Sequence, residues 1–97
     1  MFETLKYEDF NDVKNTSFTV LGFDQPYTIE LSDVSENKIR NGYEMFSLFF
    51  KSPKDYFLPQ QNYLLKHEKF GEGEIFIVPI EQNENGYLYQ AVFNRLL

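Results

Sequence analysis

The chain has 97 residues, of which 42% are hydrophobic and 19% aromatic, a composition that supplies one hydrophobic core and argues against disorder. A second domain is excluded by the length, because each half would bury too little surface to offset its chain entropy, and we predict a single β-barrel-like domain over residues 1–97. The net charge of −6 opposes contact with phosphates or an anionic bilayer, which excludes nucleic acid and membrane as partners.

We expect no targeting signal in the N-terminal segment. Its first ten residues lack the basic and apolar regions of a signal peptide, and no apolar run approaches the roughly 18 residues of a membrane span. We therefore predict a cytoplasmic protein.

Phe10 and Val13 share one side of a short helical turn that has Glu8 and Asp9 near its N-terminal end, where carboxylates are stabilising. This turn is expected to plug one end of a sheet.

Two alternating segments follow. Thr16–Phe23 places Phe18 and Val20 on one face, and it ends at a Gly, Asp, Gln and Pro turn. Tyr27–Val34 repeats the alternation with inward residues Tyr27, Ile29 and Leu31. The pair predicts an antiparallel hairpin.

The next segment, Ser35–Gly42, is polar, ends in an Asn-Gly dipeptide suited to positive φ, and is predicted to be a loop. Glu44–Phe50 is apolar on both faces: Phe46, Leu48 and Phe50 lie on one, and Met45, Ser47 and Phe49 on the other. Such a strand is either covered on both sides or presents an apolar patch to a partner. Lys51–Gln61 contains two prolines and is predicted to be a crossing loop that Tyr56, Phe57 and Leu58 hold against the core.

The C-terminal part contains three short apolar runs that predict three adjacent strands: Tyr63–His67, Ile75–Ile80 and Tyr87–Phe93. Turns are expected at Phe70–Gly73 and at Gln82–Gly86. Pro79 cannot donate to a strand ladder, which indicates an edge position or a bulge. The complete pattern predicts an all-β fold, a small six-stranded antiparallel barrel or sandwich with a short N-terminal helical turn.

No residue pattern indicates catalysis or a cofactor. The chain has no Cys, which excludes disulfides and thiolate zinc sites, and its scattered carboxylates lack the spacing of a metal loop. His67 is the only histidine, and alternation points it inward, where such a residue is usually satisfied by a hydrogen bond. We predict no catalytic residue, no metal site and no cofactor.

The leading functional hypothesis is a non-enzymatic protein-interaction module that associates with itself or with a larger assembly. Its contacts would be a sheet edge or an apolar surface, made of the residues Met45, Phe49, Leu64, Leu88 and Val92. The alternative is a barrel that binds a small molecule or carbohydrate, lined by Tyr63, His67, Tyr87 and Tyr89. An enzyme that uses His67 as a general base is a third possibility, but it needs a geometry that sequence does not supply.

Two sequence pieces also carry a family resemblance. They are LPQ-x-x-Y-x-L-x-H-x-x-x-G, from Leu58 to Gly71, and Y-x-AVFN, from Tyr89 to Asn94. With other matches along most of the chain, they resemble a family of small bacterial domains of unknown function, DUF6916. The resemblance implies a stand-alone β-rich domain without an established activity, in a phage-tail-like setting.

Three residues depart from the family pattern. Gln61 stands where Gly usually follows LPQ, Asn15 stands where Gly is common, and Gln90 replaces a frequent Glu. The amide of Gln90 keeps the shape and the hydrogen bonding of a glutamate without its charge.

Overall fold

The computed structural model describes residues 2–97. Within that range, no helix is both long enough and apolar enough to cross a bilayer. The protein measures 41 × 27 × 23 Å along its principal axes. Its elements are η1 (Phe2–Thr4), α1 (Tyr7–Asp12), β1 (Ser17–Val20), β2 (Tyr27–Val34), β3 (Lys38–Arg40), β4 (Tyr43–Ser52), β5 (Gln61–His67), β6 (Gly71–Asn83) and β7 (Gly86–Leu96).

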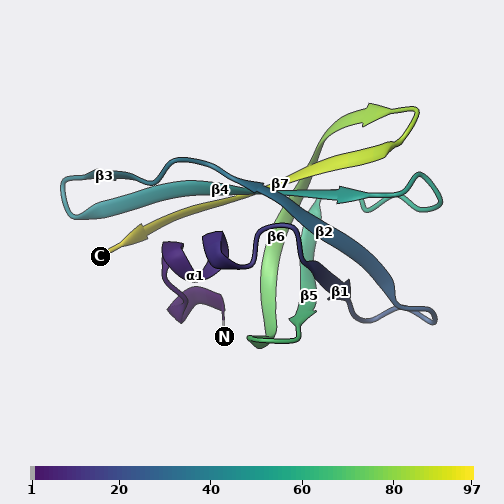
Figure 1. Cartoon of the computed structure of the whole chain (residues 1–97), viewed down its shortest axis with the longest axis horizontal. Helices are drawn as coiled ribbons and strands as arrows, with labels where there is room; N and C mark the ends of the chain where they lie inside the picture. Colours follow the sequence, from purple (N-terminus) through teal and green to yellow (C-terminus); the bar gives the residue numbers. More distant parts are fainter. Residues whose placement is uncertain (1) are drawn as a thin grey trace.

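Six of these strands close into a barrel. The strand order is β2-β1-β5-β6-β7-β4-β3, and a further pairing between β2 and β4 joins the two sides of the sheet, so that β3 lies outside the closed part (Figure 1). All of the pairings are antiparallel. The predicted all-β fold with six antiparallel strands and a short N-terminal helix is therefore confirmed; of the two predicted architectures, barrel and sandwich, the structure is the barrel, with β3 as an additional outer strand.

The prediction of a loop over Ser35–Gly42 is wrong in its second half. Asn41 and Gly42 have φ angles of 53° and 81°, and this tight turn folds the chain back so that Lys38 pairs with Met45 and Arg40 with Tyr43. The Asn-Gly dipeptide was therefore a correct turn signal. The strand that it joins to β4 is only three residues long and fully exposed, so it carries no hydrophobic alternation.

The three C-terminal strands are adjacent, as predicted, and each of them is longer than expected. Gly71 and Gly73 belong to β6, and the chain reverses before them, since His67 pairs with Gly71. The predicted turn at Phe70–Gly73 is therefore wrong in position. The register of β6 and β7 shifts between Pro79 and Glu81, which is one of the two roles predicted for this proline.

The hairpin between β6 and β7 depends on one glycine. Gly86 has a φ of +143°, and a Cβ atom built there would lie 2.0 Å from the carbonyl oxygen of Ser52. The end of β4 thus passes too close for any side chain at this position. Because Tyr87 pairs with Ser52 just beyond it, Gly86 allows β7 to enter the sheet beside β4.

The core is largely aromatic. Phe18, Leu48 and Phe50 are fully buried, as the alternation predicted. Phe10 of α1 is also fully buried, and its ring contacts four others, those of Phe2, Phe46, Phe70 and Phe93. The predicted helical turn is thus present, and its Phe10 packs into the core as expected. In Figure 1, α1 and the N-terminal turn lie together beside the strands rather than within the sheet.

The crossing loop is attached to the barrel mainly through Tyr56 and Leu58. Tyr56 stacks on Tyr27 with a centroid distance of 4.0 Å, and Leu58 is 1% exposed. Phe57 was expected to share this role, but half of it remains exposed, and it only touches Tyr87 at its edge. Two of the three predicted anchors thus pack as expected.

Candidate interaction surface

Four of the five predicted contact residues lie on the outer face of β4 and β7. Register pairs Ser47 with Val92 and Lys51 with Leu88, and Met45 and Phe49 alternate with the buried residues of β4. Side chains that pair across neighbouring strands share a face. Val92 is 58% exposed and Met45 44% exposed, whereas Phe49 and Leu88 are half-buried. We call these four residues the outer surface.

The fifth predicted residue, Leu64, is separated from the outer surface. It lies on β5, is 42% exposed and pairs with Glu74 of β6. Phe76 of β6, which is 47% exposed, lies between Leu64 and β7. Sequence reasoning missed Phe76, although strict alternation with the buried residues Ile75 and Ile77 would have placed it outside.

A polar contact crosses the outer surface. The side-chain amide of Gln90 donates to the hydroxyl of Ser47 at 2.9 Å, and the backbone N–H of Ser47 donates to the hydroxyl of Ser35 at 2.7 Å. Gln90 pairs with Phe49 and lies two residues before Val92. The amide therefore holds a fixed position among apolar neighbours.

Beside this surface, β6 and β7 diverge. They pair only from Val78 with Gln90 to Asn83 with Gly86. Before Val78, β6 pairs with β5, and after Gln90, β7 pairs with β4. The divergence is visible in Figure 1. It leaves a cavity of about 270 Å³, which we call the cleft, lined by Phe2, Glu74, Ile75, Phe76, Val92, Phe93, Asn94 and Arg95.

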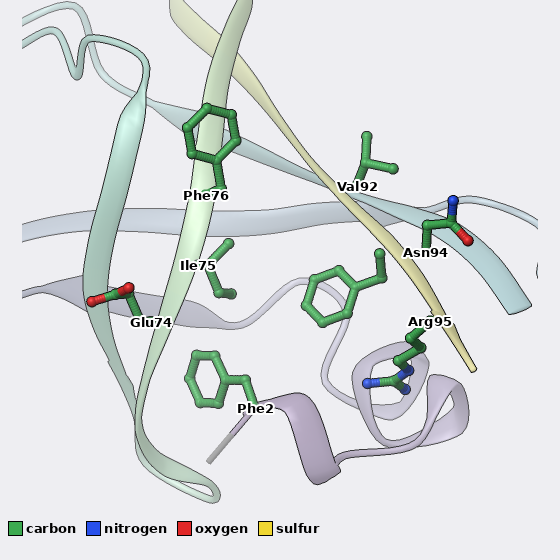
Figure 2. Close-up of a pocket in the computed structure, with 8 residues that line it drawn as sticks. Phe2, Glu74, Ile75, Phe76, Val92, Asn94 and Arg95 are labelled. Carbon is green, nitrogen blue, oxygen red and sulfur yellow. The ribbon is translucent and has the colours of Figure 1, made fainter. Parts of the chain in front are cut away.

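The lining of the cleft includes strand edges. Figure 2 shows Phe76 on β6 and Val92 on β7 at opposite sides, with Ile75 between the two strands and Phe2 at one end. Three consecutive residues of β6 and four of β7 line it. Because successive side chains of a strand point to opposite faces, such a run also brings the main chain to the wall. Phe2 is held close to β6, since a Cβ on Gly73 would lie 2.5 Å from its ring.

Three residues of the alternative ligand site, Tyr63, His67 and Tyr89, are buried, and their polar atoms are already bonded. The hydroxyl of Tyr89 accepts the backbone N–H of Leu58 at 3.0 Å and lies 3.3 Å from the hydroxyl of Ser52. The hydroxyl of Tyr63 donates to the carbonyl of Pro59. Tyr87 is only half-buried and lies 6.3 Å from Tyr89 between ring centroids. Tyr63 and Tyr89 therefore hold the crossing loop to the barrel.

His67 is 5% exposed and lies between the rings of Phe18 and Phe70. The backbone N–H of Lys69 donates to its Nδ1 at 3.0 Å, so Nε2 carries the hydrogen and donates to Oγ1 of Thr16 at 2.8 Å. Burial lowers the pKa of His67. Both nitrogens of the neutral ring are thus engaged in holding the turn after β5 to the start of β1.

Sequence analysis missed a polar cluster on the inner face of β4 and β7, opposite the outer surface. Nε of Arg95 lies 2.7 Å from a carboxylate oxygen of Glu44, which is 7% exposed, and Asn37 donates to the other oxygen at 3.0 Å. The hydrogen bond from Arg95 holds the pKa of Glu44 below its ordinary value, although burial opposes the shift. Arg95 also donates to the carbonyl of Leu5, which ties the N-terminal segment to β7. Only the long-range register of β4 and β7 brings these residues together.

Within residues 2–97, no group of three or more His, Cys, Asp or Glu side chains is placed to hold a metal ion.

The family model for a domain of unknown function, DUF6916, matches residues 5–93. The chain belongs to the DUF6916 family. Comparison with curated proteins and comparison with solved structures each gave no match.

The structure explains one of the departures from the DUF6916 pattern. Asn15 has a φ of +72°, a conformation that Gly adopts freely and Asn tolerates. Its backbone N–H donates to the carbonyl of Leu31 at 2.6 Å, which joins the end of the helical turn to β2. The position therefore needs a left-handed backbone, and Asn meets that need.

Proposed function

We propose that this DUF6916 chain is a non-enzymatic protein-interaction module that docks on a protein partner through the outer surface of β4 and β7. The observation that carries the proposal is the exposure of Val92 and Met45 on one face of two paired strands. Apolar side chains that gather on neighbouring strands, rather than singly, are typical of protein-binding surfaces.

The composition of this surface supports the same proposal. It combines an aromatic ring (Phe49), a methionine (Met45) and aliphatic side chains around the amide of Gln90. Aromatic residues and Met are enriched in the centres of protein interfaces, which also contain a few well-placed hydrogen-bonding groups. The partner belongs to a larger assembly, and the family resemblance suggests one of phage-tail-like kind.

A site-specific cross-linking experiment tests this proposal. A photoreactive phenylalanine analogue such as p-benzoylphenylalanine replaces Phe49 in one variant and Phe23 in a control variant. Phe23 is 44% exposed but lies in the turn between β1 and β2. The experiment uses bacterial cells that contain the other proteins among which this protein naturally occurs. We expect discrete adducts from position 49 and none from position 23, identified by mass spectrometry. Equal adducts from both positions, or none from position 49, would contradict docking through this surface.

A further inference from the structure

We propose that the partner includes a second copy of this chain, bound head to tail, with the β3 edge of one copy in the cleft between β6 and β7 of the next. This inference rests on the proposed function and names the partner and a second contact. It follows from two separate features of the molecule that complement each other in charge and in the faces that their side chains occupy.

The first feature is the free edge of β3. In the strand order β3 is terminal, with β4 as its neighbour, and all three of its residues are exposed. Ile39 is 64% exposed. Lys38 and Arg40 pair with Met45 and Tyr43, so their side chains lie on the outer face, while Ile39 lies on the opposite face. A chain with a net charge of −6 thus presents an edge with two cations and one apolar residue between them.

The second feature is the cleft. Its main-chain edges on β6 and β7 are not paired with each other beyond Val78 and Gln90. Glu74 lines the cleft and is exposed, and the described residues contain no ion pair to it. Ile75 is buried on the inner side. An inserted strand could therefore bond to a free edge, place an apolar side chain inward and bring cations to Glu74 outward.

These two features match on both faces of the sheet. Ile39 on the inner face would meet the apolar lining around Ile75 and Phe2, and Lys38 and Arg40 on the outer face would meet Glu74. Opposite charges on paired strands are stabilising. The β3–β4 hairpin lies at one end of the longest axis of the molecule, which leaves its edge accessible to another copy (Figure 1).

The same charges disfavour a symmetric dimer. Two β3 edges side by side would bring Lys38 and Arg40 of both copies together, and like charges on paired strands are destabilising. A contact between two different surfaces of one molecule repeats from copy to copy, and it closes into a ring or extends as a filament. The charge pattern therefore selects a head-to-tail contact.

A charge-exchange experiment tests the contact. The edge variant is K38E/R40E, and the cleft variant is Glu74→Lys. Two control variants change the net charge equally at other exposed positions, K54E/K69E for the edge and Glu84→Lys for the cleft. The mass of each is measured by analytical ultracentrifugation as a function of concentration and salt, after circular dichroism shows that it is folded.

For the wild type and both controls, we expect a mass at low salt of at least twice the 11.6 kDa of one chain. This mass should fall as added salt screens the charges. Each charge-exchange variant alone should remain a monomer, because the residues at positions 38, 40 and 74 then all carry the same sign. Their equimolar mixture should associate again, since each variant supplies the charge that the other lacks.

Other outcomes would overturn the inference. If Glu74→Lys associated like the wild type while K38E/R40E did not, β3 would bind a surface other than the cleft, and the head-to-tail contact through the cleft would be wrong. If the wild type stayed monomeric at all concentrations but position 49 formed adducts in cells, the proposed function would stand and the head-to-tail contact would not. A monomer without adducts at position 49 would remove both.

Discussion

The closed side of the barrel, which we define by His67 and Tyr89, and the open side around the cleft differ in what their side chains and strand edges contact. On the closed side, the ring of His67 and the hydroxyl of Tyr89 are buried and bonded to their own chain. On the open side, Val92 and Phe76 are about half exposed and two strand edges lie free. The difference separates stability, which depends on the closed side, from association, which depends on the open side.

Removing an aromatic ring from the core should show the largest effect on stability. Phe10→Ala deletes a fully buried ring that contacts four others. We expect the free energy of unfolding to fall by about 3–5 kcal/mol, because a cavity remains where the ring was. Urea denaturation followed by circular dichroism measures this loss. A loss below about 1 kcal/mol would show that α1 is not part of the core.

Tyr89→Phe should have the next largest effect. The substitution keeps the ring but removes the acceptor of the Leu58 N–H, which is buried with it. An unsatisfied buried donor costs about 1–3 kcal/mol, and we expect a loss of stability in that range. Thermal unfolding of this variant beside the wild type provides the measurement. An unchanged midpoint would mean that the crossing loop does not depend on this hydrogen bond.

His67 should make the closed side sensitive to acid. Its pKa is lowered by burial in the folded protein, so below its ordinary value of 6.5 the unfolded chain binds the proton more readily. Stability should therefore fall as the pH decreases from about 6.5 toward the lower folded pKa. Denaturation midpoints measured from about pH 7.5 down to about pH 5 would follow this loss of stability.

The matched variant for this test is His67→Gln. It should be less stable than the wild type at pH 7 by about 1–2 kcal/mol, because hydrogen bonds of the buried ring are lost. Its stability should depend less on pH through the same window, since glutamine does not titrate. The interpretation fails if both proteins lose stability equally between these pH values.

Substitutions that test the backbone conformation of Asn15 should change the free energy of unfolding by less. Asn15→Ala places an ordinary side chain at a φ of +72°, and we expect a loss of about 1 kcal/mol. Asn15→Gly should be as stable as the wild type, because Gly adopts this conformation without strain. Chemical denaturation of the two variants in parallel compares them, and equal losses would show that the backbone conformation does not control this position.

A substitution on the open side should have the smallest effect on stability. Val92 is 58% exposed, so Val92→Thr should change the free energy of unfolding by no more than about 0.5 kcal/mol. The same variant should weaken association, because Val92 belongs to both the outer surface and the cleft. Denaturation and ultracentrifugation on one sample compare the two effects. A large loss of stability would show that the closed and open sides are not separate.

The candidate site was partly predictable from sequence. Alternation places Met45, Phe49, Leu88 and Val92 outside, because each strand has one buried face that the apolar residues on the other side identify. The cleft was not predictable, since it exists only because β6 and β7 separate after a local pairing. The pair of Glu44 and Arg95 was also missed, because 51 residues separate them and only strand register makes them neighbours.

The amino-acid sequence alone determined the all-β class, the inward faces of most strands and the turn at Asn41 and Gly42. These features follow from interactions between residues close in the chain, such as period-two burial and the backbone preferences of Asn and Gly. Tertiary structure decided the closure of the barrel by β2 and β4, the outer position of β3 and the cleft. Such long-range pairings depend on the summed geometry of all the strands, which no local pattern encodes.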